Sequence, residues 1–407
     1  SDKLKEQIPG FFHSEMKILD KDAAPRRKGS HQHGHRIKHV LASQLRGQPL
    51  KCLVIDVKTG GVLAMASKPS FDANLFVNGI SFKDYNALRD DSGNPLFNRA
   101  INGSYPPGST VKPFIGLAGL ETQTVNHVQS IYCPGHYRIK NAGRTFRDWK
   151  RTGHGTIDLE KSIEQSCDVY YYDLAYSMGI DKMHDYLAQF HFGKQTGIDM
   201  PAETSAVLPS QEWKKRRYKQ SWLPGDTVNA GIGQGYFLVS PVQLAYATAV
   251  LAADGKLIHP RLASRIGKQS ALSPGAEMES IHKKDPQNWE HVIDGMLAVT
   301  EGQRGTAKRI RNEHYRIAGK TGTAQVISMK QNEEYDETKL EKEFHDHALF
   351  MAFAPAEDPE IAVAVIAENG GHGGATAAPI ARQVMDAWFG IKPGEPLQRM
   401  AQEESDE

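Results

Sequence analysis

The sequence predicts a mixed α/β fold, because strand-length apolar runs and helical patterns both recur along its 407 residues. Residues 52–57 and 62–67 are apolar and flank a short turn at 58–61, which predicts a β-hairpin. The runs at 349–354 and 363–366 predict two further strands that lie side by side. The hydrophobic fraction of 39% is ordinary for a soluble globular protein, so a fully disordered or fibrous chain is excluded.

Four helices are expected. Ser109 begins the first, because Pro113 is tolerated only in a first turn. Residues 159–178 predict the second, and residues 378–389 the last. The third begins at Ser240, where Gln243 completes a capping box and proline occupies the first helical position.

Charge and length exclude several classes of function. The 49 basic and 48 acidic side chains nearly cancel, whereas a general nucleic-acid-binding protein needs a basic face. No apolar run approaches 18 residues, so no segment of this sequence is expected to span a membrane. The first residue is not methionine and no signal peptide is visible, which suggests a trimmed or mature fragment of a longer protein. Segments 269–286 and 331–346 are polar and predict surface loops.

Three short motifs carry reactive side chains. Ser109 and Lys112 form an S-x-x-K directly after a Pro-Pro-Gly turn, so serine and lysine share one helical face. A partly desolvated lysine can be neutral and accept the serine proton. Ser166 and Asp168 supply a second hydroxyl and a carboxylate, and Lys320 begins a K-T-G. Gly322 is expected to let a ligand approach the backbone, and residues 324–327 are expected to form a strand.

In this order the three motifs resemble those of penicillin-binding proteins and β-lactamases, although the middle motif is S-x-D. Further segments resemble class B penicillin-binding proteins, specifically the elongation-type penicillin-binding protein 2 of Gram-negative bacteria. They are the Pro-Ser-Phe-Asp-Ala-Asn-Leu-Phe of 69–76, the Gly-Ile-Ser of 79–81, the Asn-Arg-Ala of 98–100, the Arg-Asp-Trp-Lys of 147–150, the Gly-Ile-Gly-Gln-Gly-Tyr of 231–236 and the Glu-Asn-Gly-Gly of 368–371.

The resemblance implies a specific architecture: a five-stranded antiparallel sheet between helices, plus an all-helical subdomain. It assigns residues 45–390 to a transpeptidase domain and residues 1–44 to a remnant of an N-terminal pedestal or linker. Residues 391–407 form an acidic tail that is expected to be disordered. The family is periplasmic and is anchored to the inner membrane by an N-terminal helix that is absent from this sequence.

The resemblance also implies roles for the motif residues. Ser109 attacks a D-Ala-D-Ala donor, Lys112 takes its proton, and Ser166 with Lys320 passes a proton to the leaving D-Ala. Thr321 and Thr323, around Gly322, bind the donor carboxylate, and the backbone N–H groups of Ser109 and Thr323 form an oxyanion hole. A diaminopimelate amine of a second stem peptide then resolves the acyl-enzyme, and β-lactams imitate the donor. For Asp168 two roles stay open: holding both lysines charged, or steering the acceptor amine.

Two other functions remain to be distinguished. A D,D-carboxypeptidase or β-lactamase would deacylate rapidly, and a β-lactam sensor would acylate without cross-linking. The chemistry itself needs no cofactor. The family also implies partners for the full-length protein: a membrane-embedded glycosyltransferase and other proteins of the elongation complex.

Three cysteines are too few for a disulfide framework. Cys133, Asp148, His154 and Cys167 together form a chemically complete zinc set, with His136 as an alternative ligand. A structural zinc, a Cys133–Cys167 disulfide and two unrelated buried thiols are all consistent with the sequence. Cys52 is expected to be a core thiol.

Overall fold

The structure is a computed structural model that describes residues 49–140, 143–266, 269–270, 279–326 and 340–391, together with Ile37 and Val40. The predicted N-terminal segment and acidic tail therefore lie almost wholly outside the described residues, as do large parts of the two predicted loops. Within the described ranges, no helix combines the length and the apolar composition needed to cross a membrane.

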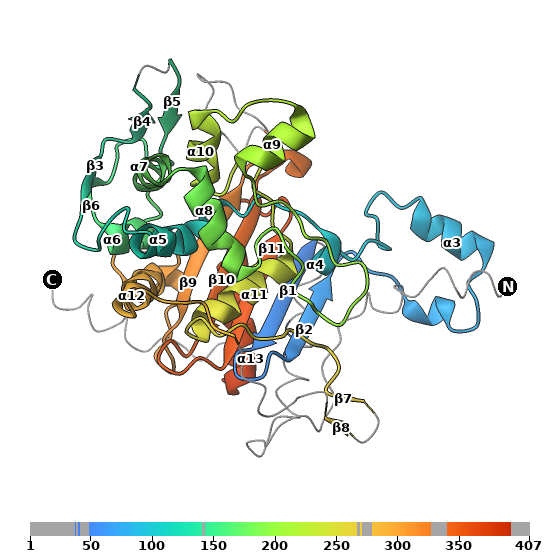
Figure 1. Cartoon of the computed structure of the whole chain (residues 1–407). Helices are drawn as coiled ribbons and strands as arrows, with labels where there is room; N and C mark the ends of the chain where they lie inside the picture. The colour runs from blue at the N-terminus through green and yellow to red at the C-terminus, as the bar shows by residue number, and fades with distance from the viewer. Residues whose placement is uncertain are drawn as a thin grey trace.

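A five-stranded sheet in the order β2-β1-β11-β10-β9 forms the centre of the molecule (Figure 1). Every neighbouring pair is antiparallel, which confirms the predicted sheet. All seven residues of β11 and seven of the eight in β10 are buried, because helices cover both faces of the sheet. The strands are β1 (Leu50–Asp56), β2 (Val62–Ser67), β9 (Ala318–Ala324), β10 (His347–Ala354) and β11 (Ile361–Ala367).

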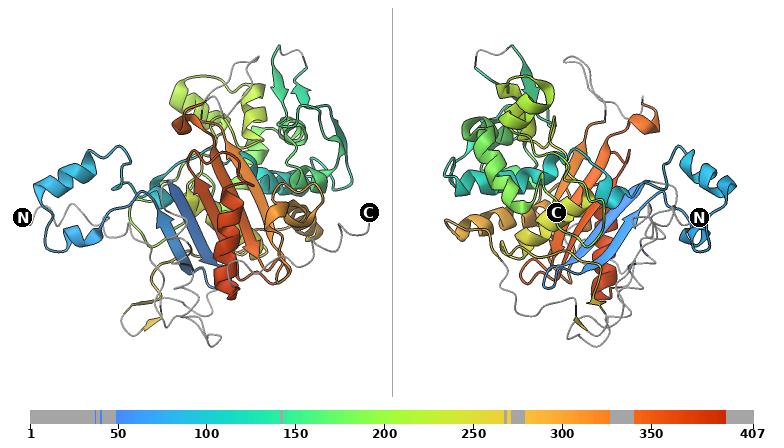
Figure 2. Two further views of the ribbon diagram at one scale, coloured as in Figure 1. Left: turned by 180° about the vertical axis from the view of Figure 1, so that it is seen from behind. Right: turned by 45° about the vertical axis from the view of Figure 1, so that its right-hand side comes forward.

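Helices lie on both sides of this sheet. On one side α11 (Pro241–Ala252) crosses β11, β1 and β10, and all of its residues are buried. On the other side α13 (Ala377–Phe389) packs along β10 and β11 (Figure 2). The capping box of α11 forms as predicted, since Gln243 N donates to Ser240 Oγ and Ser240 N donates to Gln243 Oε1.

A helical subdomain extends the α11 side. Its helices are α5 (Lys112–Glu121), α6 (Leu159–Glu164), α7 (Asp168–Met178), α8 (Ile180–Leu187), α9 (Gln211–Tyr218), α10 (Pro224–Ala230) and α12 (Gln287–Glu301). The single helix predicted over residues 159–178 is wrong, because α6 ends at Glu164 and α7 begins at Asp168. Ser166 lies in this break with φ of +57°, a left-handed conformation that no helix continues through.

The strand expected over residues 324–327 is also wrong. Strand β9 (Ala318–Ala324) ends at the first of these residues, Gln325 and Val326 are not in a strand, and Ile327 lies outside the described residues. The K-T-G motif lies inside β9, whose Thr321 pairs with Phe350 of β10. The sequence of β9 contains two glycines and no aliphatic β-branched residue, so pairing with a buried neighbour, rather than intrinsic propensity, makes it a strand.

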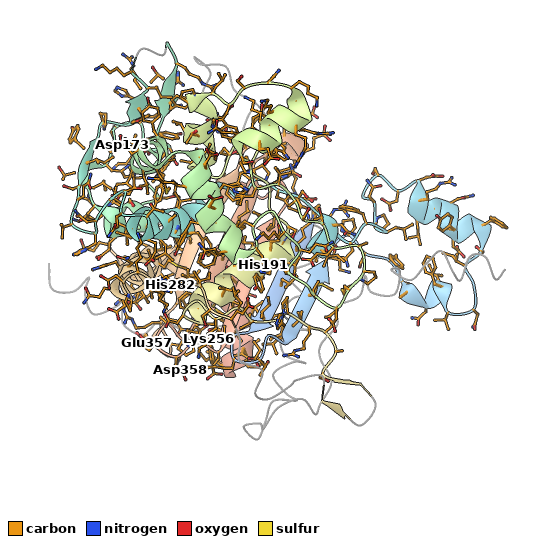
Figure 3. All side chains as sticks on the ribbon, viewed as in Figure 1. Asp173, His191, Lys256, His282, Glu357 and Asp358 are labelled. Atoms are coloured by element: carbon orange, nitrogen blue, oxygen red, sulfur yellow. The ribbon has the colours of Figure 1, made fainter. Side chains whose placement is uncertain are left out.

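Smaller elements complete the fold. A projecting arm carries α3 (Phe82–Arg89), and α4 (Arg99–Asn102) returns the chain to the sheet. Three two-stranded sheets pair β3 (Ile131–Cys133) with β6 (Gly155–Ile157), β4 (His136–Arg138) with β5 (Thr145–Arg147), and β7 (Arg265–Ile266) with β8 (Gln269–Ser270). The 3₁₀ turns are η1 (Ala73–Phe76), η2 (Gly108–Val111), η3 (Ala188–Phe190), η4 (Lys308–Ile310) and η6 (Lys342–Phe344). Figure 3 shows how side chains fill the spaces between the sheet and its helices.

Candidate active site

Ser109 lies on the 3₁₀ turn η2, immediately before α5, and its side chain is half-buried. The α-helix itself begins at Lys112, three residues later than the predicted start, with Pro113 in its first turn. Gly108 holds φ of +51° and donates its N–H to the carbonyl of Gly233 at 2.9 Å. The turn is therefore held both by the hydrogen bond to Gly233 and by helix α5, which follows it.

Lys112 and Lys320 meet at the hydroxyl of Ser166. Ser166 Oγ lies 3.3 Å from Lys112 Nζ and 2.9 Å from Lys320 Nζ. Both lysine side chains are completely buried. The left-handed backbone of Ser166 places this hydroxyl in the gap between α6 and α7, so the break in the predicted helix creates the site.

Asp168 pairs with only one of the two lysines. Its Oδ1 accepts a hydrogen bond from Lys112 Nζ at 2.7 Å, and its Oδ2 accepts one from the backbone N–H of Trp149 at 3.0 Å. The indole Nε1 of Trp149 donates in turn to the carbonyls of Gln165 and Ser166. Trp149 thus joins the second motif to the preceding loop, although the residue as a whole is 59% exposed.

Hydrogen bonding distinguishes the two lysines. Lys112 Nζ has three acceptors, namely Ser166 O, Ser166 Oγ and Asp168 Oδ1, which matches the three N–H groups of an ammonium. Lys320 Nζ has two, Ser166 Oγ and Thr321 O. Burial lowers the pKa of Lys320 well below its usual value, and the Lys112 charge lowers it further. The resting arrangement therefore suits a charged Lys112 beside a neutral Lys320.

The edge strand β9 packs directly against the turn that carries Ser109. A Cβ on Gly322 would lie 2.8 Å from Thr110 Cγ2 and 3.0 Å from the Pro107 carbonyl. A Cβ on Gly108 would lie 2.6 Å from the Thr323 carbonyl oxygen. The missing side chain of Gly322 thus makes room for the turn that bears Ser109, which differs from the ligand approach expected from the sequence.

Thr321 and Thr323 differ in their partners. Thr321 Oγ1 forms a hydrogen bond of 2.8 Å with Thr306 Oγ1. The Thr323 carbonyl accepts from Gln234 Nε2 at 3.2 Å, on the side of β9 that faces away from β10. Because the N–H and C=O of a strand residue point to the same side, the Thr323 N–H also faces the Ser109 turn.

This arrangement has counterparts among known proteins. The family model for the penicillin binding protein transpeptidase domain matches residues 51–386. The chain belongs to the penicillin-binding protein transpeptidase family. Its residues also superpose on the crystal structure of Pseudomonas aeruginosa PBP2 in complex with WCK 5153, with a TM-score of 0.80 and 44% identity, covering 89% of this chain and 77% of that one.

Curated relatives in the family carry the name peptidoglycan D,D-transpeptidase MrdA. The chain is 44% identical to the Haemophilus influenzae protein over 357 residues, and 40% identical to the Escherichia coli K12 protein over 354 residues. These matches cover 87% and 86% of this chain but 55% and 56% of the relatives, so the chain spans about half their length. A complex of PBP2 and MreC from Helicobacter pylori is 32% identical, with a TM-score of 0.78, over 87% of this chain and 62% of that one. The resemblance to the PBP2 branch is thereby confirmed.

Three residues of this transpeptidase domain contribute to the site without having been assigned a role from the sequence. They are Trp149, Gln234 and Thr306. Trp149 and Gln234 lie within the segments 147–150 and 231–236 that resemble the family, so these segments could have indicated that both residues belong to the site. Thr306 lies in none of the motifs; it follows α12, which packs against β9, and its N–H donates to the Glu164 carbonyl.

The predicted zinc ligands also come together. One ligand atom from each of Cys133, Asp148, His154 and Cys167 lies within 4.8 Å of the other three, and all four side chains are buried. Cys133 and Cys167 are both free, so the alternative disulfide is not formed. His136 is exposed on β4 and is not in the cluster. Cys52 is buried in β1, as expected.

The four side chains of this cluster have shifted pKa values. The hydrogen bond with Cys133 and burial raise the pKa of Cys167. Burial lowers the pKa of His154, but hydrogen bonds with Asp148 and Cys133 outweigh burial and raise that pKa overall. A hydrogen bond with Cys167 lowers the pKa of Cys133 to about 6, which favours its thiolate at neutral pH. Burial opposes charge on Asp148, but hydrogen bonds from His154 and from backbone N–H groups outweigh it and hold the pKa at about 2. Two sulfurs, an imidazole and a carboxylate, brought within 4.8 Å of one another, fit the donor set of a structural zinc.

Proposed function

We propose that this chain is the catalytic domain of a serine D,D-transpeptidase that cross-links peptidoglycan stem peptides during cell elongation. The observation that carries the proposal is the hydroxyl of Ser166 between two buried lysines, one of which, Lys112, directly follows the turn that bears Ser109. The substrates are a D-Ala-D-Ala donor and a diaminopimelate amine, and β-lactams acylate the same serine.

In the acylation step, Ser109 Oγ attacks the carbonyl carbon of the penultimate D-Ala, and its proton goes to Lys112. Lys112 is first made neutral when a proton passes through Ser166 Oγ to Lys320, which is within hydrogen-bond distance of that oxygen. The N–H groups of Ser109 and Thr323 stabilise the oxyanion. The C–N bond breaks, and the leaving D-Ala amine receives a proton from the Ser166–Lys320 pair.

In the second step, the diaminopimelate amine attacks the ester carbon and loses a proton to the same lysine system. The Ser109 C–O bond breaks, a new peptide bond forms, and the serine regains its proton. Thr321 and Thr323 hold the donor carboxylate during acylation. Asp168 keeps the Lys112 ammonium in place between cycles, because it pairs with that lysine alone.

Mass spectrometry after incubation with benzylpenicillin tests this function. The expected result is a stable adduct on the wild-type chain and none on Ser109→Ala. Absence of an adduct, or an adduct that persists in Ser109→Ala, would refute the proposal. An adduct that is hydrolysed within seconds would favour a carboxypeptidase or β-lactamase, and an adduct without cross-linking of stem peptides would favour a sensor.

We also propose that Cys133, Asp148, His154 and Cys167 hold a structural zinc ion. The ion would stabilise the loop whose Asp148 Oδ2 accepts the backbone N–H groups of Asp168 and Val169 at the start of α7. Protein purified without chelators should contain one zinc per chain, and Cys167→Ser should contain none. Cys52→Ser, which removes a buried thiol outside the cluster, is the matched control. Wild-type zinc well below one per chain would refute the site.

The proposed location is the periplasm, with attachment to the inner membrane in the full-length protein. In that setting the partners are a membrane glycosyltransferase and an elongation-complex protein related to MreC, since a PBP2 structure contains MreC. Another similar structure concerns coordination of polymerization and crosslinking by a peptidoglycan synthase complex. Co-purification of the full-length protein with such partners tests this arrangement.

A further inference from the structure

Exposed cations gather on α9 and on the residues that follow it. Lys215, Arg216, Arg217 and Lys219 are all exposed, and within the described part of the chain only Arg216 has an ion-pair partner, Glu212 at 3.5 Å. The whole chain has a net charge of only +1, so this concentration of positive charge is local. Figures 1 and 3 show α9 at the periphery of the molecule, beside α10.

Aromatic rings lie beside these cations. The ring of Tyr236 has Trp213, Tyr218 and Trp222 around it, with centroid distances of 5.3, 5.4 and 6.4 Å. Tyr218 is 47% exposed. We call this surface the α9 rim. It consists of the aromatic residues Trp213, Tyr218, Trp222 and Tyr236 and the three cations that have no ion-pair partner among the described residues, Lys215, Arg217 and Lys219.

A buried ion pair fixes the rim from beneath. Lys214 is 3% exposed, and its Nζ lies 2.5 Å from Asp226 Oδ2 at the start of α10. The same ammonium lies 5.4 Å from the centroid of the Tyr236 ring, a cation–π arrangement. The rings are therefore held in place and need little ordering when a ligand binds.

The α9 rim is joined to the active site by a short piece of backbone. Tyr236 follows Gln234, whose Nε2 reaches the Thr323 carbonyl of β9, and Gly233, whose carbonyl accepts the Gly108 N–H beside Ser109. A stem peptide bound along β9 beside Ser109 would therefore leave the rest of its polymer close to the rim.

We propose that the α9 rim binds the peptidoglycan strand outside the acyl-donor pocket, an inference that rests on the function proposed above. Stem peptides carry free carboxylates that match Lys215, Arg217 and Lys219, and the apolar faces of sugar rings suit the exposed ring of Tyr218 and the half-buried rings beside it. The rim adds affinity for polymer, whereas a β-lactam engages only the pocket around Ser109.

The double variant K215E/R217E tests this assignment. We expect its co-sedimentation with purified peptidoglycan sacculi to weaken about tenfold at low salt, since two exposed charge contacts become repulsive. Labelling by fluorescent penicillin should keep its wild-type rate. The matched control is K83E/K256E, which changes the charge equally at exposed positions on α3 and just after α11, away from the rim. The neutral variant Tyr218→Ala should also weaken sacculus binding, with little dependence on salt.

Three results would overturn the assignment. The first is unchanged sacculus binding by K215E/R217E, and the second is an equal loss of sacculus binding in K83E/K256E. The third is that K215E/R217E loses binding to anionic phospholipid vesicles but not to sacculi. If penicillin fails to label the wild-type chain, the proposed function fails, while the sacculus assay still decides whether the rim binds polymer.

Discussion

Lys112 Nζ lies 2.7 Å from Asp168 Oδ1, and the lysine side chain has no exposed surface. This ion pair joins the first catalytic motif to the second across 56 positions of sequence. Asp168 lies at the start of α7, so the pair also fixes that helix against α5. The carboxylate therefore balances a charge that cannot reach solvent.

Asp168→Asn should destabilise the protein by roughly 3 kcal/mol, because removing one partner leaves a buried charge without compensation. Urea denaturation measures this change in the free energy of unfolding. Asp358→Asn is the matched control, since Asp358 pairs with Lys58 on the surface and should change stability by no more than about 0.5 kcal/mol. Equal effects of the two variants would show that Lys112 is not held as an ammonium.

Lys320→Met should abolish most acylation, by about a hundredfold or more, because Ser166 Oγ loses the neutral amine beside it. The folded pKa of Lys320 lies well below 10.5, so the folded state binds fewer protons than the unfolded state between the two values. Wild-type stability therefore rises with pH across that window.

The stability of Lys320→Met relative to wild type should consequently increase as pH falls from about 10 to 7. Urea denaturation at several pH values measures this trend. Lys182→Met, at an exposed position, should show no such trend. A constant difference between Lys320→Met and wild type across this range would contradict a lowered pKa.

Ser166→Ala and Ser166→Gly should both slow acylation by about a hundredfold, since each removes the hydroxyl shared by the two lysines. Their stabilities should differ, because φ of +57° suits glycine and costs alanine roughly 1 kcal/mol. Thermal denaturation and penicillin labelling give the two readouts. A glycine variant no more stable than the alanine variant would argue against the left-handed backbone at this position.

Gly322→Ala should slow penicillin acylation by tenfold or more, because its Cβ would meet Thr110 and the Pro107 carbonyl and displace the Ser109 turn. Gly143→Ala, where nothing lies within 4 Å of an added Cβ, is the control and should acylate normally. Normal acylation by Gly322→Ala would mean that β9 and the turn can separate without loss of geometry.

The local parts of the fold could be predicted from the sequence. The hairpin of β1 and β2 and the capping box at Ser240 depend on neighbouring residues, and both formed as expected. The break at Ser166 could not be predicted, since residues 159–178 show a continuous helical pattern and only tertiary contacts favour the left-handed serine. Lys320 illustrates the same limit. Its motif identified it, but its burial and lowered pKa depend on Ser166 and Lys112, both far away in sequence.

Gly108, Gly233 and Gly322 bring together backbone from three distant parts of the chain, where an added Cβ would meet neighbouring atoms at 2.2 to 2.8 Å. The position of Ser109 therefore depends on contacts of its turn with β9 and with Gly233, whose carbonyl accepts the Gly108 N–H. Contacts so far apart in sequence form late in folding, because loop closure must precede them. An incompletely folded or misfolded chain should therefore not be acylated by penicillin at Ser109. The extent of penicillin labelling then measures the fraction of molecules that has reached the native state.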